Sequence, residues 1–120
     1  MLLDYYRNKT AIKEGKLTVE EIYANNKYVY DDIPISQPVI SKVERIISSL
    51  PVEPEIHVTG RDTINIEYDR PDKSYLEFEV FKDKIVMLKV PHRDYSKAIE
   101  KEVNEEDIYN IVKSFYQEST

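Results

Sequence analysis

Stretches of alternating apolar and polar residues lie between Glu55 and Val90, and they constrain the fold more than any other feature of the chain. Alternation with a period of two places successive side chains on opposite faces of a β-strand. The apolar members of the two clearest stretches are Ile64, Ile66, Tyr68, Leu76, Phe78 and Val80. The sequence therefore predicts an antiparallel sheet with one buried face and one polar face.

Short polar segments separate the stretches and predict turns between neighbouring strands. Residues 60–62 and 82–84 are expected to form three-residue loops, and residues 69–74 a longer turn. Pairing inward side chains with inward side chains then fixes the register of each hairpin. The expected inward pairs are Ile56–Ile66, Val58–Ile64, Tyr68–Leu76, Ile66–Phe78, Ile64–Val80, Val80–Val86, Phe78–Leu88 and Leu76–Val90.

Two amphipathic helices are predicted, over residues 36–50 and 104–117, because apolar residues recur there with helical spacing. Ser36 and Asn104 are the expected N-caps, and Pro38 fits a first turn, where no amide hydrogen is needed. The expected buried stripes are Val39, Ile40, Val43, Ile46, Ile47 and Leu50 in the first helix, and Ile108, Ile111, Val112 and Phe115 in the second.

The N-terminal segment, residues 1–35, is expected to be partly helical and partly irregular. A helix over residues 1–14 would end at Gly15. Thr18 and Glu21 have the spacing of a capping box and predict the start of a second short helix.

These elements predict a single α+β domain over residues 1–120. Its centre is an antiparallel meander of four or five strands over residues 55–100, with a weaker last strand over residues 95–100. Helices before and after the meander pack on one face of it. The order is therefore helices, then strands, then a final helix.

Composition excludes several classes of function. The chain has no cysteine and only two glycines, which excludes disulfides, thiolate metal sites and glycine-rich phosphate loops. Residues 1–50 contain 7 basic and 7 acidic residues, whereas residues 51–120 contain 10 basic and 16 acidic ones, so the net charge of −6 belongs to the second half. An acidic surface disfavours direct contact with nucleic acid and suits a basic protein partner.

The chain carries no motif of a known enzyme class, and its two histidines, His57 and His92, are read as ordinary surface residues. No enzymatic activity, cofactor or metal is therefore expected. No apolar run approaches the roughly 20 residues of a membrane span. The first residues lack the basic and apolar regions of a signal peptide. A cytoplasmic protein without membrane contact is expected.

The predicted register also sorts the polar side chains of the sheet into cross-strand rows. The rows are Glu55, Glu67, Glu77 and Lys89, then His57, Asn65, Glu79 and Met87, then Thr59, Thr63, Phe81 and Ile85. Glu67 opposite Glu77 brings like charges together, which destabilises a sheet. Phe81, Ile85 and Met87 would form an exposed apolar patch, which a monomer rarely leaves bare.

Both features indicate a binding surface on the outer face. The candidate partner-binding residues are Glu55, His57, Glu67, Glu77, Glu79, Phe81, Ile85 and Met87. Three alternatives stay open. The carboxylate face is merely solvated, or Glu55, Glu67, Glu77 and His57 form a divalent-ion site, or the apolar patch is covered by the N-terminal segment or by a second copy of the chain.

A resemblance to a known family rests on four short segments. The segment Asn26-Lys-Tyr-Val-Tyr-Asp-Asp-Ile-Pro-Ile-Ser36 is similar to the opening Asn-Trp-Asp-Gly-Tyr-x-Ala-x-Pro-Ile-Ser of a family of small, uncharacterised bacterial and phage-borne proteins. The later segments that resemble the family pattern are Pro54–Thr59, Ile64–Tyr68 and Tyr75–Glu79. Lys27 stands where the family has Trp, and Tyr28-Val29 replaces Asp-Gly.

The resemblance covers about residues 26–81. It implies the same fold and a shared pattern for Glu67, Glu77 and Glu79, and it suggests a mobile-element or defence-related setting. Together with the charge, it leads to the expectation of a small, non-enzymatic, acidic protein-binding module, a regulator or inhibitor of antitoxin-like or anti-defence type that acts through the outer sheet face. A structural homodimer, or an enzyme that uses the face carboxylates with a metal or ligand, are the alternatives.

Overall fold

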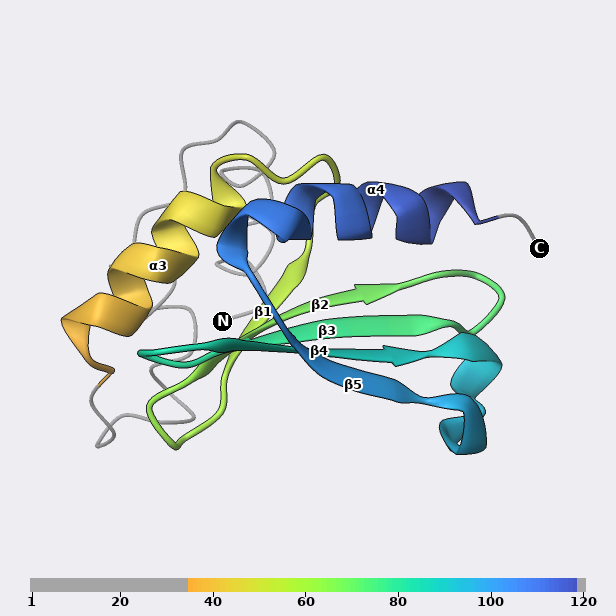
Figure 1. Ribbon diagram of the computed structural model, residues 1–120, viewed down its shortest axis with the longest axis horizontal. Coiled ribbons are helices and arrows are strands. Elements are labelled where there is room, and N and C mark those ends of the chain that lie inside the picture. Colours follow the sequence, from red (N-terminus) through yellow and green to blue (C-terminus); the bar gives the residue numbers. More distant parts are fainter. Residues whose placement is uncertain (1–34, 119–120) are drawn as a thin grey trace, which may run out of the picture.

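A computed structural model of the chain describes residues 35–118. It has an α+β fold in two layers, as the sequence predicts: a five-stranded antiparallel sheet with both helices on one face (Figure 1). The elements are α3 (Gln37–Ile47), β1 (Glu55–Val58), β2 (Ile64–Asp69), β3 (Tyr75–Val80), β4 (Ile85–Val90), β5 (Ile99–Val103) and α4 (Ile108–Gln117). The strands follow one another in the sheet in chain order. The expected helices and loop before residue 35 lie outside the described residues.

Helix α3 buries most of the predicted stripe against the sheet, with Val39, Val43, Ile46 and Ile47 in the core. It ends at Ile47, before the predicted end at residue 50, so Leu50 lies outside the helix and is partly buried. Ser36 holds the N-cap position, but its side chain makes no capping hydrogen bond, so that part of the prediction is wrong. Its backbone amide instead donates to Asp62 Oδ1 at 2.6 Å. A carboxylate near the first turn of a helix meets the positive end of its dipole. The start of α3 is thereby tied to the loop between β1 and β2.

Helix α4 packs its apolar side chains beside those of α3 and completes the core. Ile108, Val112 and Phe115 are buried and Ile111 is partly buried, as predicted. The segment before the helix differs from the prediction: a short 3₁₀ helix, η3 (Glu105–Asp107), precedes α4, and Asn104 makes no side-chain cap. Arg70 contacts the other end of α4, where its Nη1 donates to the carbonyl of Phe115 at 2.5 Å.

The first two hairpins have the predicted register. Ile56 pairs with Ile66 across β1 and β2, and Ile66 pairs with Phe78 across β2 and β3. The loop at Gly60 has the three expected residues, since the amide of Thr59 donates to the carbonyl of Thr63 at 3.2 Å. Gly60 has φ of 90°, a left-handed value that costs glycine little.

The third hairpin is shifted by one residue from the prediction. The amide of Phe81 donates to the carbonyl of Lys84 at 2.9 Å, which leaves a two-residue loop in place of the expected three. Val80 therefore pairs with Ile85, not Val86, and Phe78 pairs with Met87, not Leu88. Because side chains alternate along a strand, this shift exchanges the two faces of β4.

The last strand also differs from the prediction. Residues 95–97 form a short 3₁₀ helix, and β5 extends from Ile99 to Val103, beyond the expected end of the sheet at residue 100. Its pairing with β4 places Glu100 opposite Leu88 and Glu102 opposite Val86. Among the described helices, none is long and apolar enough to cross a membrane.

Candidate functional site on the outer sheet face

The face of the sheet turned away from α3 and α4 is called the outer face below, and two cross-strand rows of side chains lie across its centre. The first row is Glu55, Glu67, Glu77, Leu88 and Glu100, and the second is His57, Asn65, Glu79, Val86 and Glu102. The first three members of each row are those that the sequence predicts. The remaining members follow from the shifted β4 and the longer β5.

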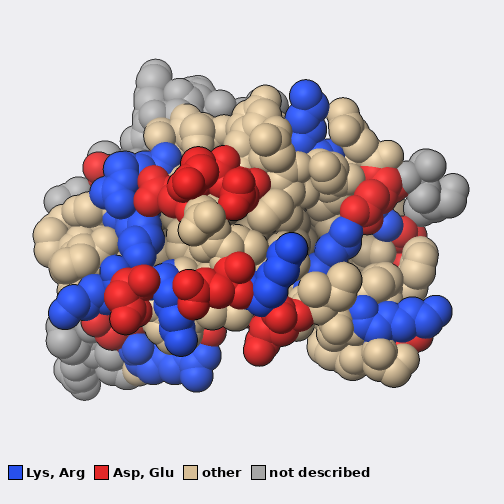
Figure 2. All heavy atoms as spheres, in the orientation of Figure 1, with Lys and Arg blue, Asp and Glu red and all other residues tan. Residues whose placement is uncertain are grey.

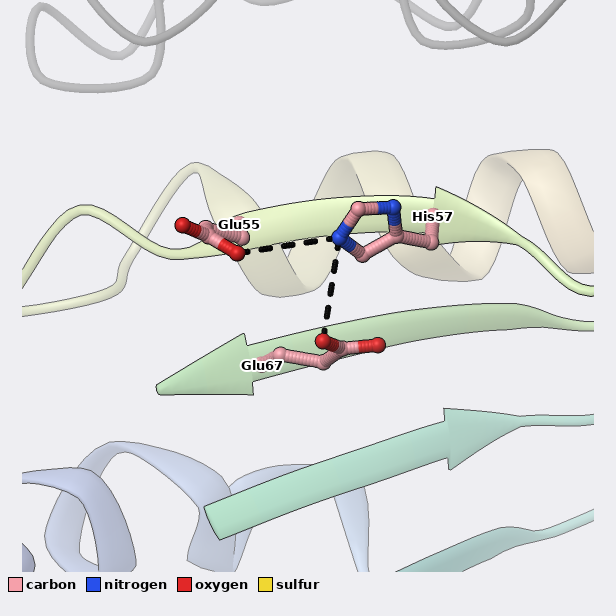
Figure 3. A group of neighbouring side chains, drawn as sticks. All are labelled: Glu55, His57 and Glu67. Carbon is pink, nitrogen blue, oxygen red and sulfur yellow. Dashed lines mark ion pairs between the residues drawn. The ribbon is translucent and has the colours of Figure 1, made fainter. Parts of the chain in front are cut away.

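Three of these side chains converge at one end of the outer face (Figure 3). His57 Nε2 lies 3.7 Å from Glu55 Oε2 and 3.7 Å from Glu67 Oε1. Glu55 and His57 are two residues apart on β1, so they share a face, and Glu67 lies directly opposite Glu55 on β2. The backbone of two paired strands thus holds the three side chains together.

The carboxylate of Glu67 is the most enclosed of this group, with 18% of its side chain exposed against 46% for Glu55. Burial raises the pKa of Glu67, and the charges of Glu77 and Glu55 raise it further. His57 and a hydrogen bond from Asn65 lower it, but the pKa stays above its ordinary value. Within residues 35–118 no Lys or Arg forms an ion pair with this carboxylate.

Glu77 is the next member of the row and accepts a hydrogen bond of 2.8 Å from the Tyr75 hydroxyl. Burial, followed by this hydrogen bond, raises the pKa of Tyr75 well above its ordinary range, so the phenol stays a donor at neutral pH. A neutral donor stabilises the carboxylate of Glu77 but leaves its charge uncompensated. Glu67 and Glu77 therefore face each other as like charges, as predicted.

Glu79 has a different environment, although it lies on the same face. Arg61 donates to it from Nε at 2.8 Å and from Nη2 at 2.6 Å, and the Thr63 hydroxyl donates at 2.6 Å. Burial raises the pKa of Glu79, but these hydrogen bonds and the charge of Arg61 outweigh it, so the pKa lies below its ordinary value. A bidentate arginine satisfies a carboxylate almost completely. Glu79 is thus engaged within the protein.

The prediction of an apolar patch formed by Phe81, Ile85 and Met87 on the outer face is wrong. Ile85 and Met87 lie in the core with 3% and 4% exposure, because the shifted register turns them inward. Phe81 alone remains on the outer face, partly buried, with Lys84 Nζ 4.9 Å from the centre of its ring. Four of the eight predicted site residues stay together on the outer face. Glu55, Glu67 and Glu77 form one cross-strand row, and His57 lies beside it.

Sequence reasoning missed five residues of the outer face: Val86, Leu88, Val90, Glu100 and Glu102. Val90 pairs with Tyr75, not with Leu76 as predicted. Val86 and Leu88 were expected inside, and Lys89 was expected to compensate the acidic row. Lys89 instead lies on the inner face and pairs with Glu118 near the end of α4. The acidic row therefore has no lysine within it and ends in a further glutamate on β5.

A second group of acidic side chains lies where α4 begins (Figure 2). It contains Glu105, Glu106 and Asp107 in the η3 turn. Arg45 on α3 makes two hydrogen bonds to Glu105, at 3.2 and 3.1 Å. Acidic side chains beside a helix N-terminus are a common stabilising arrangement. The acidic side chains of this group therefore have a structural role at the start of α4.

In comparisons with known proteins, no family model, no curated protein and no solved structure matches the chain. The resemblance to the small bacterial and phage-borne proteins stays a prediction.

Proposed function

We propose that this protein is a non-enzymatic interaction module that binds a basic protein partner through the outer face. The observation that carries the proposal is the cross-strand row Glu55–Glu67–Glu77, in which like charges stand side by side. Each such pair destabilises an isolated sheet by a few tenths to about 1 kcal/mol. A lysine or arginine of a partner would relieve this repulsion, so binding is favoured at this row.

The shifted register adds a second feature that fits a protein partner. Leu88 continues the acidic row and Val86 the neighbouring one, and both are partly exposed. Glu100 and Glu102 on β5 lie beyond them and are exposed. The result is a small apolar strip between two acidic borders. Protein interfaces commonly combine an apolar centre with a polar rim.

The chemistry of the face fits a regulatory role better than a catalytic one. A partner would present basic side chains around a few apolar ones, and complementary charge would accelerate its association. A small acidic inhibitor or regulator of antitoxin-like or anti-defence type fits this description. The homodimer alternative loses its basis, because Ile85 and Met87 are not available at the surface.

Charge reversal tests this proposal. Affinity capture and mass spectrometry would first identify the partner, and its affinity would then be measured for two double variants. Glu67→Lys with Glu77→Lys reverses the row, while Glu105→Lys with Glu106→Lys makes the same change of net charge at the start of α4. We expect the row variant to bind at least about tenfold more weakly, mainly through slower association, and the control to change little.

Equal weakening by both variants would show that overall charge, and not the row, attracts the partner. Unchanged affinity of the row variant, with circular dichroism showing an intact fold, would remove the proposal. A raised salt concentration should weaken the wild type more than the row variant, because screening acts on the charges that the variant has already lost.

A further inference from the structure

The end of the outer face at β1 combines ligand types that bind metal ions. Glu55, His57 and Glu67 each offer one ligand atom, and these atoms all lie within 4.8 Å of one another (Figure 3). A set of one imidazole nitrogen and two carboxylate oxygens suits divalent transition metals, above all Zn²⁺. Purely acidic surface groups lack the nitrogen ligand, so this set differs in kind from the other carboxylates of the face.

The spacing of the three atoms is close to what one ion requires. Zn²⁺ binds nitrogen and oxygen at about 2.0–2.1 Å, so neighbouring ligand atoms of a tetrahedral site are about 3.3 Å apart. His57 Nε2 lies 3.7 Å from an oxygen of Glu55 and 3.7 Å from an oxygen of Glu67. Small rotations of the side chains would close the remaining gap, and both strands that carry them are fixed by sheet pairing.

The environment of Glu67 gives independent support. Its carboxylate is largely enclosed and lies directly across from Glu55 on one side and Glu77 on the other. Asn65, directly across the strands from His57, has a buried amide oxygen with no hydrogen-bond partner among residues 35–118. A cation held here would compensate the charge of the Glu67 carboxylate.

We propose that Glu55, His57 and Glu67 form a binding site for one divalent transition-metal ion, with Zn²⁺ preferred over Mg²⁺. The preference follows from the imidazole, because Mg²⁺ requires an octahedral set of oxygen ligands and Zn²⁺ accepts nitrogen. His57 is about half exposed, with 48% of its side chain accessible, so the ion can enter from solvent and keep a water ligand. The site goes beyond the proposed function and does not depend on it.

The composition of the chain makes the test sharp, because it contains two histidines and no cysteine. The untagged full chain would be titrated with ZnCl₂ and with MgCl₂ by calorimetry, while NMR follows the ring signals of both histidines. We expect one Zn²⁺ per chain, a shift of the His57 signals without a shift of the His92 signals, and much weaker binding of Mg²⁺. His57→Ala and Glu67→Gln should each weaken Zn²⁺ binding at least about tenfold.

His92→Ala is the matched control and should bind Zn²⁺ as the wild type does. The proposal is overturned if His57→Ala and His92→Ala bind equally, or if Zn²⁺ and Mg²⁺ bind with the same affinity, because the acidic face would then attract cations without a defined site. Absence of saturable Zn²⁺ binding to the wild type would also overturn it. The NMR signals of the wild type keep the test valid even if a variant folds poorly.

Discussion

Two carboxylates on the same face of the sheet, Glu67 and Glu79, have opposite environments. Glu79 receives three hydrogen bonds from Arg61 and Thr63, and its charge is neutralised within the protein. Glu67 is similarly enclosed, but no Lys or Arg among residues 35–118 forms an ion pair with it, and it stands between two other glutamates. The acidic face therefore has two different parts. The charge of Glu79 is compensated within the protein, whereas the charge near Glu67 can be compensated by a ligand.

Both carboxylates lie on the outer face, and adjacent residues of β4 test with the largest effect which residues of that strand share this face. Ile85→Lys would place a charge in the core and should lower the free energy of unfolding by about 3–5 kcal/mol. Val86→Lys lies on the outer face opposite Glu79 and Glu102 and should change it by less than about 1 kcal/mol. Urea denaturation measures both, and the reverse order of effects would restore the register expected from the sequence.

Neutralising each carboxylate sharpens the contrast directly. Glu79→Gln should lose about 1–2 kcal/mol of stability, because the charge-assisted hydrogen bonds from Arg61 and Thr63 become weaker. Glu67→Gln should leave stability unchanged or raise it by up to about 1 kcal/mol, since it removes a like-charge repulsion. Denaturant unfolding at pH 7 compares the two variants. A loss of similar size in both would mean that Glu67 has a partner equivalent to Arg61.

The pH dependence of these two effects has a defined sign. Folding lowers the pKa of Glu79, so its stabilisation is present at neutral pH and disappears as pH falls through that lowered value. Folding raises the pKa of Glu67, so the cost of ionising it is absent at low pH and appears as pH rises through the raised value. Both substitutions should therefore lose their effects on unfolding in acid, with Glu67→Gln losing its effect at the higher pH.

The smallest effect on stability is expected at Glu55. Its carboxylate is nearly half exposed, and Glu55→Gln should change the free energy of unfolding by less than about 0.5 kcal/mol. The same substitution removes one of the three metal ligands, so it should weaken Zn²⁺ binding without a matching loss of stability. Thermal denaturation with and without Zn²⁺ separates the two quantities. A large loss of stability without metal would show that Glu55 is structural.

Alternation could predict the fold in those strands where only every second residue is apolar, because such a strand can bury only one of its two faces. In β2 the inward residues Ile64 and Ile66 alternate with Asn65 and Glu67, so the register of the first two hairpins followed from the sequence. The resulting glutamate row and its neighbour His57 were therefore predictable.

The β4 register was not predictable in the same way, because consecutive residues of β4 are apolar and either face of the strand could be buried. Ile85 and Val86, and likewise Met87 and Leu88, are neighbours that could each face the core. The choice depends on whether the preceding loop has two or three residues, and the sequence Lys82-Asp83-Lys84 permits both. Backbone closure between Phe81 and Lys84 decides the face.

The pairing of Glu79 with Arg61 could not be predicted from hydrophobic periodicity either. Arg61 lies in a loop, and its direction depends on the left-handed backbone of Gly60 and Asp62 on either side of it. A charged edge strand is similarly hard to recognise: β5 has exposed charged residues at most positions, so its apolar signal is weak. Both features depend on tertiary geometry and not on periodicity.

The most direct test of the contrast is an NMR titration of the side-chain carboxyl carbons in the full chain without added metal. The signal of Glu67 should titrate above the ordinary range of a glutamate, and that of Glu79 below it. This order would establish that one carboxylate of the outer face lacks compensation while the other has it. Titration of the two signals at the same pH, or in the reverse order, would contradict the account.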